Sequence, residues 1–311
     1  MSPETTPESI PEISIIVPHL NQPDFLAGLL ASLHAQDFDM ARAEVIVVDN
    51  GSRALPRAQV ARHPNITLVE EAVPGPGPTR NRGAALARAP LLAFTDADCR
   101  VAPDWLARIL ARFAADPGLA ILGGDIRIYP ASPGRQTVAE AYECLYAFPQ
   151  KDYIARQSFS VTANLATRRA VFDAVGPFAG IEIAEDTDWG QRAARAGYRT
   201  VYAPDIVVHH PARRSMAELY AKWDRNVSHH YAAFAGGAAG KLRWGAKTLA
   251  MGLSPVLEIP RILRSDRVAG LRPRLQAFCG LAAVRAYRAR KMAAVMLRPG
   301  TAAAKVQWNR R

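Results

Sequence analysis

The sequence predicts an α/β fold with a mostly parallel central sheet flanked by helices, followed by a basic helical C-terminal extension. Two observations predict the sheet: four short runs are apolar on both faces, and segments of helical length and periodicity lie between them. Such alternation is typical of a parallel sheet covered on both sides by helices. The third observation, an uneven distribution of charge along the chain, predicts the extension.

The expected strands lie within the first hundred residues and read ISIIVP (13–18), EVIVVD (44–49), ITLVEE (66–71) and LLAFTD (91–96). The segments between them read FLAGLLASLHAQ, RALPRAQVARH and GPTRNRGAALARA, and each has the length and apolar spacing of a helix. Ligands of parallel sheets bind beyond the carboxyl ends of the strands. Three strands end in polar groups there, which marks a candidate site.

Past residue 118 the pattern is less regular. AILGGDIRIYP predicts a strand, GRQTVAEAYECLYAF a helix, and SVTANLATRRAVFDAVGPF a strand, a turn and a helix that ends at Gly176. EDTDWGQRAARAGY predicts a helix that Asp186 or Thr187 caps and Gly197 closes, and the strand pair RTVYAP and DIVVHH follows. Beyond His210 we expect mainly helices with basic faces.

Composition divides the chain into a disordered, Pro-rich leader (1–12), an α/β domain (13–211) and a basic extension (212–311). Residues 1–211 hold 19 basic and 24 acidic residues, a net charge of −5, whereas residues 212–311 hold 20 and 4, a net charge of +16. The leader lacks the layout of a secretory signal, and no apolar run approaches the roughly 18 residues of a membrane span. We therefore expect a cytoplasmic protein, with a peripheral position on the inner face of the membrane as a variant.

Seven segments occur in a fixed order: ISIIVPHLNQ, VIVVDNGS, GPTRNRGAALARA, FTDAD, TANLATRR, EDTDWGQRAARAG and VVHHPARRS. At this order and spacing they resemble the family 2 glycosyltransferases, over about residues 13–215. The resemblance implies the GT-A fold, a Rossmann-like α/β fold. It also implies a metal-dependent, inverting transfer of sugar from a nucleotide-sugar donor to a hydroxyl group of a saccharide or lipid-linked acceptor.

The metal site implied by the resemblance starts from Asp96 and Asp98, which follow an apolar strand. A diphosphate leaving group gains negative charge as the glycosidic bond breaks, and a hard cation held by carboxylates neutralises it. The resemblance implies that Asp98 binds Mg²⁺ or Mn²⁺, that Asp96 contacts the ribose or the metal shell, and that His210, or alternatively His209, is a further ligand. The alternatives are a helix cap for the aspartates, although Asp104 is the more natural cap, and a structural histidine.

The resemblance also implies a donor site whose residues come from several segments: Pro18, Asn21, Asp49, Arg80, Asn81, Asp96, Arg213 and Arg214. Asp49 would read the nucleotide, and the two late arginines would clamp phosphate by bidentate hydrogen bonds. Three alternatives stay open. DNGS is a simple turn, Arg80 lies on a solvated helix face, and the late arginines begin the basic tail.

The catalytic step needs a base, because an acceptor hydroxyl must lose its proton as it attacks the anomeric carbon. The resemblance assigns this role to Asp186, a supporting role to Glu185 and stacking on a sugar face to Trp189. The alternative for Asp186 is a helix cap. GGDIRIYP and SVTANLATRR would form the floor of the acceptor site, with Asp125 and Asn164 as contacts.

The tail contains a helix expected from about residue 273 to 297. One face would hold Leu275, Phe278, Cys279, Ala282, Ala286, Ala289, Ala293, Met296 and Leu297, and the basic residues Arg274, Arg285, Arg288 and Lys291 fall mostly off it. A basic amphipathic helix can lie on an anionic bilayer and bring the enzyme to a lipid-linked acceptor. Alternatively, this face packs on the catalytic domain and the arginines are solvated. We expect no nucleic-acid partner, because no recognition motif accompanies the charge.

Two rival functions predict different features. A nucleotidyltransferase on a related sheet would carry a Gly-rich, basic loop straight after the first strand, and PHLNQPDF does not supply one. A non-catalytic membrane or nucleic-acid adaptor would be favoured by loss of Asp98 or Asp186, and both are present.

Overall fold

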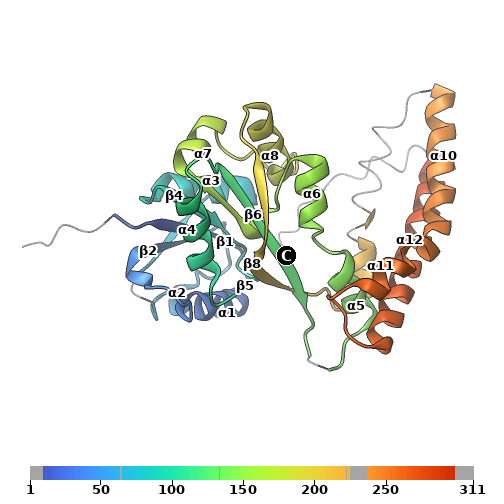
Figure 1. Cartoon of the computed structure of the whole chain (residues 1–311), viewed down its shortest axis with the longest axis horizontal. Coiled ribbons are helices and arrows are strands. Elements are labelled where there is room, and N and C mark those ends of the chain that lie inside the picture. Colours follow the sequence, from blue (N-terminus) through green and yellow to red (C-terminus); the bar gives the residue numbers. More distant parts are fainter. Residues whose placement is uncertain (1–9, 64, 133, 222, 225–236, 298–311) are drawn as a thin grey trace, which may run out of the picture. The chain divides into compact units, whose positions relative to one another are not determined.

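The computed structural model describes residues 10–63, 65–132, 134–221, 223–224 and 237–297 (Figure 1). The chain forms two compact units, the first made of residues up to 127 and residues 148–210, the second of residues 128–147 and residues from 211 onward. The units divide between residues 210 and 211, and the domain boundary expected at 211–212 stays a prediction. The sequence did not predict that residues 128–147 belong to the same unit as the extension. Of the leader expected at 1–12, residues 1–9 lie outside the described residues.

An eight-stranded mixed sheet forms the centre of the first unit (Figure 1). In chain order its strands are β1 (Ile13–His19), β2 (Ala43–Asp49), β3 (Ile66–Glu70), β4 (Leu91–Phe94), β5 (Arg100–Val101), β6 (Ile121–Tyr129), β7 (Leu165–Arg168) and β8 (Thr200–Pro211). Across the sheet the order is β3-β2-β1-β4-β7-β6-β8-β5. The first four are parallel, whereas β7 is antiparallel to β4 and β6, and β5 to β8.

The four strands predicted before residue 97 are therefore confirmed, and they form the parallel half. The strand pair predicted over 199–210 is instead the single long strand β8. Its second half pairs with the two-residue strand β5, where Arg100 lies opposite His209. This pairing matters for the site, because it brings the end of β8 to the loop that follows β4.

Helices cover both faces of the sheet, as predicted. On one face α1 (Pro23–His34) and α4 (Trp105–Ala115) pack on Ile15 and Val17 of β1. On the other, α3 (Pro76–Leu86), α7 (Arg169–Val175) and α8 (Glu185–Arg195) pack on Ile16 of the same strand. Because strand side chains alternate between faces, β1 must be apolar throughout to be buried on both.

The shorter helical elements of the first unit are η1 (Met40–Arg42), α2 (Arg57–Val60), α6 (Gln150–Gln157) and η2 (Thr162–Asn164). The helix predicted from RALPRAQVARH is thus reduced to one turn. Its first residue follows Pro56, the N-cap, and a proline there prevents the helix from extending toward the N-terminus.

The second unit is helical and contains α5 (Val138–Tyr146), α10 (Gly237–Leu253), η3 (Ser254–Glu258), α11 (Ile259–Arg264) and α12 (Leu271–Leu297). Thr137 and Glu140 form a capping box at the start of α5. Gly280 of α12 lies against α5 so closely that an added Cβ would stand 2.8 Å from the Cβ of Tyr142. None of the described helices combines the length and the apolar character that a membrane span requires.

The tail helix predicted from about 273 to 297 is confirmed as α12, but its buried face is not the predicted one. Ala277, Leu281, Val284 and Met292 are buried, whereas Leu275 is 59% exposed and Cys279 is exposed. Apolar and small residues occur all round this helix, so periodicity alone does not choose a face. The close approach of α5 at Gly280 does.

Candidate active site

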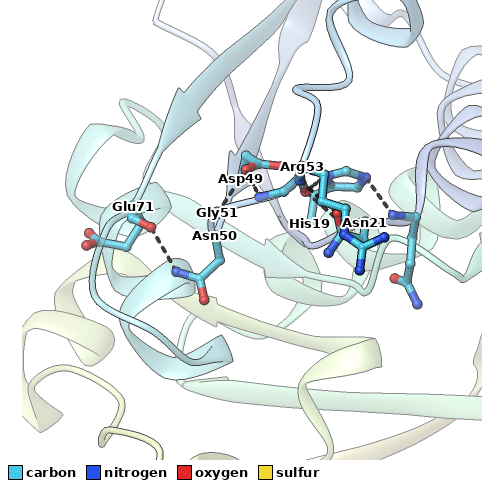
Figure 2. Close-up of polar contacts among 9 residues, drawn as sticks. His19, Asn21, Asp49, Asn50, Gly51, Arg53 and Glu71 are labelled. Atoms are coloured by element: carbon cyan, nitrogen blue, oxygen red, sulfur yellow. Dashed lines mark hydrogen bonds and ion pairs between the residues drawn. The ribbon is translucent and has the colours of Figure 1, made fainter. Parts of the chain in front are cut away.

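The loops after β1 and β2 are tied together by a buried hydrogen bond between side chains at the carboxyl edge of the sheet (Figure 2). His19 Nδ1 lies 2.8 Å from Asp49 Oδ2, and both side chains are fully buried. His19 Nε2 accepts a hydrogen bond from the backbone N–H of Gln22, so the ring proton lies on Nδ1 and is donated to Asp49. The parallel register places these two residues opposite each other.

Asp49 holds the loop that follows it. Its Oδ1 accepts hydrogen bonds from the backbone N–H groups of Gly51 (3.0 Å) and Ser52 (2.8 Å). Burial alone would raise the pKa of Asp49, but the hydrogen bonds from Ser52 and His19 outweigh it, so the pKa is lowered and the residue is an anion. Since the carboxylate is fully buried, its observed role is to shape the loop; the predicted contact with the nucleotide stays a prediction.

Asn21 joins the two loops a second time. Its backbone N–H donates to Ser52 Oγ at 2.8 Å, and its side-chain oxygen accepts from the backbone N–H of Arg53 at 2.9 Å (Figure 2). Asn21 has a φ of 53°, a left-handed conformation that asparagine tolerates better than most residues. The half-buried Pro18 lies one residue before the end of β1, at the same edge.

Asn50 fixes the loop that leads into α3. Its amide donates to the carbonyl groups of Glu71 and Val73 and its oxygen accepts from Gly75 N–H at 2.8 Å. An added Cβ at Gly77 would stand 2.0 Å from the carbonyl oxygen of Ala179, so only glycine permits this approach. These contacts fix residues 74–78, which contain the start of α3, and so set the position of Arg80.

Arg80 joins the two acidic motifs. Its Nη2 lies 2.6 Å from Asp96 Oδ1 and its Nη1 lies 2.8 Å from Glu185 Oε1, while the arginine is 3% exposed. Burial alone would lower the pKa of Arg80, but the two carboxylates outweigh it, so the guanidinium stays charged. The solvated-face alternative for Arg80 is therefore wrong.

Asp98 and His210 lie together, as the predicted metal pair requires. His210 Nε2 is 3.5 Å from Asp98 Oδ2, and the side chains are 14% and 21% exposed. His209, the alternative, pairs with Arg100 of β5 instead. Burial and then the charge of Arg127 lower the pKa of His209. Neighbouring residues of a strand point to opposite faces, so only one of the two histidines can face Asp98.

Asp186 lies in the first turn of α8, next to Glu185. Burial and then the charge of Glu185 raise the pKa of Asp186 to about 6, against the opposing effects of Thr187 and Arg80. The N-cap is Ala184 and no side chain caps the helix, so the capping roles expected for Asp186 or Thr187 are wrong. A carboxylate with a pKa near neutrality is suited to act as a base at physiological pH.

Two residues predicted for the site make structural contacts instead. Trp189 is 1% exposed, donates from Nε1 to the carbonyl group of Gly176 at 3.0 Å, and lies against Phe172 and Phe178, with ring centroids 5.8 and 5.4 Å away. It cannot stack on a sugar. Asn81 bonds to both backbone groups of Phe178, so its observed role is to hold that segment to α3.

The expected acceptor contacts are also buried. Asn164 is 2% exposed; its amide donates to the carbonyl groups of Asp125 (2.7 Å) and Ile206 (2.9 Å), and its oxygen accepts from Trp105 Nε1. Asp125 is equally buried and accepts hydrogen bonds from Tyr202 and from Arg127. Both residues stabilise the sheet, and the structure does not support their assignment as acceptor contacts.

Arg213 and Arg214 belong to the second unit. Arg213 donates from its backbone N–H and from Nη1 to the buried carboxylate of Glu143, each at 2.7 Å, and Arg214 is exposed. An arginine that neutralises a buried glutamate has a structural role. This favours the alternative in which these residues begin the tail.

Tyr153 is a further candidate near Asp186 that the sequence reasoning missed. It lies half-buried on α6, and its ring stacks on Phe159 with the centroids 4.9 Å apart. Phe159 in turn contacts α8, since an added Cβ at Gly190 would stand 2.5 Å from the Cβ of Phe159. Burial and then the charge of Asp186 raise the pKa of Tyr153. No motif contains this residue, and only the packing of α6 on α8 reveals it.

Comparison with known proteins agrees with this geometry. Residues 14–181 match the family model described as Glycosyl transferase family 2. Over 211 residues the chain is 31% identical to the glycosyltransferase AglE of Haloferax volcanii, covering 66% of this chain and 68% of that protein.

Solved structures show the same fold. The mannosyltransferase PcManGT from Pyrobaculum calidifontis, in complex with GDP-Man and Mn²⁺, superposes with a TM-score of 0.56 at 21% identity, over 96% of this chain and 77% of that one. S. aureus TarS in complex with UDP-GlcNAc superposes with a TM-score of 0.52 at 17% identity, over 93% and 92%. The GT-A fold expected from the sequence is thereby confirmed.

Proposed function

Because the chain belongs to glycosyl transferase family 2, we propose that it is a metal-dependent, inverting glycosyltransferase that uses a nucleotide-sugar donor and a saccharide or lipid-linked acceptor. One observation carries the proposal: Arg80 joins Asp96 to Glu185, and so links the loop that holds Asp98 to the helix that holds the candidate base, Asp186. Donor and acceptor chemistry need this proximity, since the acceptor oxygen must reach the carbon that the diphosphate leaves.

The donor is assigned to the loops after β1 and β2 and to Asp96. The hydrogen bonds around His19, Asn21 and Asp49 fix both loops before a ligand arrives, and preorganisation reduces the entropy lost on binding. The fold neighbours were solved with GDP-Man and with UDP-GlcNAc, which supports a nucleotide-sugar donor. The two donors differ in both base and sugar, so they do not select one for this chain.

The metal is assigned to Asp98 and His210. Adjacent ligands of Mg²⁺ in octahedral geometry stand about 3 Å apart, and the 3.5 Å between these two side chains fits one cation between them. No cluster of three or more acidic, histidine or cysteine side chains occurs in the described ranges, so the donor phosphates and water would complete the coordination. When bound, the cation would neutralise the charge of the departing diphosphate.

The reaction proposed for Asp186 is a single displacement. Its carboxylate removes the proton of an acceptor hydroxyl while the oxygen bonds to the anomeric carbon and the bond from that carbon to the diphosphate breaks. The proton ends on Asp186, the electron pair leaves with the diphosphate, and the configuration inverts. The charge of Glu185 makes Asp186 a stronger base, and Arg80 holds Glu185 in place.

The decisive experiment is a donor screen. The protein is incubated with Mn²⁺ or Mg²⁺ and a panel of UDP-, GDP- and dTDP-sugars, and the released nucleoside diphosphate is measured alongside pyrophosphate. A glycosyltransferase releases the nucleoside diphosphate. A second incubation contains a sugar phosphate and a nucleoside triphosphate, and pyrophosphate production there would support a nucleotidyltransferase and contradict the proposal.

Replacement of Asp98 by alanine is expected to abolish the divalent-dependent part of donor binding without unfolding the protein, because the side chain is partly exposed at a strand end. Calorimetric titration of the active donor with and without Mn²⁺ measures this. The matched control is Asp104→Ala, which removes an aspartate that pairs with Arg108 at the start of α4. Equal metal dependence in wild type and Asp98→Ala would refute the assignment.

We also assign Tyr153 to the acceptor site, because the ring is half-buried and senses the charge of the proposed base. Tyr153→Phe removes one hydrogen bond and should raise the acceptor KM about tenfold, the scale of one such bond, with donor affinity unchanged. Tyr198→Phe, a half-buried tyrosine packed on the core, is the control. A change in donor affinity without one in acceptor KM would contradict the role.

A further inference from the structure

The helix α10 has two faces, and one of them has no apolar partner among the described residues. Trp244 is 1% exposed and donates from Nε1 to the carbonyl group of Met292 on α12. On the opposite side, at positions i, i+7 and i+11, Leu242, Leu249 and Leu253 are 78%, 67% and 68% exposed. This side of α10 is therefore an exposed leucine stripe.

The stripe continues along the chain into η3 and α11. Val256 and Leu257 are 63% and 81% exposed, and Leu263 is 52% exposed, whereas Pro255 and Ile262 turn inward and are buried. Nine of the fifteen exposed large apolar side chains in the described part of the chain lie in residues 242–275. We call Leu242, Leu249, Leu253, Val256, Leu257 and Leu263 the leucine face.

Basic residues accompany the leucine face. Residues 237–275 hold eight basic and two acidic residues, a net charge of +6, and α10 itself has no acidic residue. Lys241, Arg243 and Arg264 are exposed. One of the two acids, Glu258, already accepts a hydrogen bond from Arg285 at 2.9 Å. The local charge is therefore strongly positive.

The basic residues of α12 behave differently. Arg285 bonds to Glu258, Arg288 lies over the ring of Trp223 at 3.7 Å, and Lys291 is 3.1 Å from Asp224. These three side chains contact groups of their own unit. They are therefore less available to a membrane than the sequence suggested, and exposed basic residues lie instead on α10 and α11.

We propose that the leucine face binds the surface of an anionic lipid bilayer. Leucines enter the boundary between headgroups and acyl chains, and neighbouring Lys and Arg side chains extend to the phosphates, where each contributes about 1 kcal/mol. A neutral protein partner would match the leucines but not the charge. The consequence for catalysis, that the acceptor is lipid-linked, rests on the proposed function; binding to lipid does not.

The test is co-sedimentation of the full chain with phosphatidylcholine vesicles that contain or lack phosphatidylglycerol, at low and high salt. Binding should require the anionic lipid and weaken with salt, because exposed charges are screened over about 8 Å at physiological ionic strength. The variant Leu249→Gln/Leu253→Gln/Leu257→Gln should bind at least about tenfold more weakly, since three apolar side chains no longer enter the lipid. The variant Lys241→Gln/Arg243→Gln/Arg264→Gln should bind more weakly and with a smaller salt dependence, because three of the eight basic residues lose their charge.

The matched control is Phe25→Gln/Leu86→Gln/Val201→Gln, which changes three exposed apolar residues of the first unit and should bind as wild type does. Thermal melts confirm that each variant is folded. Vesicle binding that survives the leucine changes would overturn the proposal. A second outcome would also overturn it: wild type is a dimer by light scattering, the leucine changes dissociate the dimer, and wild type does not bind vesicles. Nucleotide release measured without vesicles reports on the proposed function separately.

Discussion

Replacement of Asp186 by asparagine is expected to lower sugar transfer by about 10²–10⁴-fold while making the protein more stable at neutral pH. Asparagine keeps the shape of the side chain but accepts no proton from the acceptor hydroxyl. Donor affinity should persist, because the change leaves Asp98 and the loops around Asp49 intact. Single-turnover transfer and donor titration separate the two effects.

The gain in stability follows from the sign of the pKa shift. The folded protein holds the Asp186 proton with a pKa of about 6, against the ordinary pKa of 3.8 in the unfolded chain, so the ionised form is disfavoured in the fold. Ionisation of Asp186 lowers the stability of the fold. This loss is absent below the unfolded pKa of 3.8, grows between pH 3.8 and about 6, and is constant at higher pH. A two-unit shift corresponds to about 3 kcal/mol, and partial exposure reduces this to about 1–2 kcal/mol.

Melting curves of wild type and Asp186→Asn should therefore coincide at pH about 4 and separate by a few degrees at pH about 8. The transfer rate of wild type should fall as the pH decreases through about 6, because the base becomes protonated. Glu185→Gln removes the like charge, so the fall in the transfer rate should occur at lower pH. Near-normal transfer by folded Asp186→Asn would show that the base lies elsewhere.

The strands could be predicted from sequence because their signal is local. β1, β2 and β4 are apolar at successive positions, and that pattern by itself demands burial on both faces. The pairing of Asp98 with His210 has no local signal, since it depends on β5 lying beside β8. The family resemblance supplied it, and the structure also shows which of the two histidines takes part.

The errors share one cause. The resemblance placed Trp189, Asn164 and Asp125 at the acceptor, but each is buried by a partner distant in the sequence. Residue type says which contacts a side chain can make, whereas burial decides which contacts it does make. The buried face of α12 was missed for the same reason, because α5 selects it.

Replacement of Arg80 by methionine is the change with the largest expected effect on stability. Methionine fills much of the volume but leaves Asp96 and Glu185 without their shared cation, next to Asp186. Removing one partner of a buried ion pair costs about 3–5 kcal/mol, and we expect about 3 kcal/mol here, because the two carboxylates are 30% and 18% exposed. Denaturant unfolding of the full chain measures the difference.

Arg80→Met should also alter the acid limb of the pH–rate profile, that is, the pH at which the transfer rate falls. The charge of Arg80 lowers the pKa of Asp186, so its loss should move the limb above pH 6. A residue that only fills space would not produce this shift. Arg80→Lys keeps the positive charge, but its ammonium group cannot reach both carboxylates as the two Nη atoms of arginine do. It should therefore restore the pH–rate profile more fully than the free energy of unfolding.

A double-mutant cycle with Glu185→Gln isolates the interaction. If Arg80 stabilises the fold by neutralising Glu185, the two changes together should cost less than the sum of the single changes, by at least about 1 kcal/mol. Additive losses and an unchanged pH profile would mean that Arg80 acts through packing alone. The loop that holds Asp98 and the helix α8 would then have to be joined by another contact.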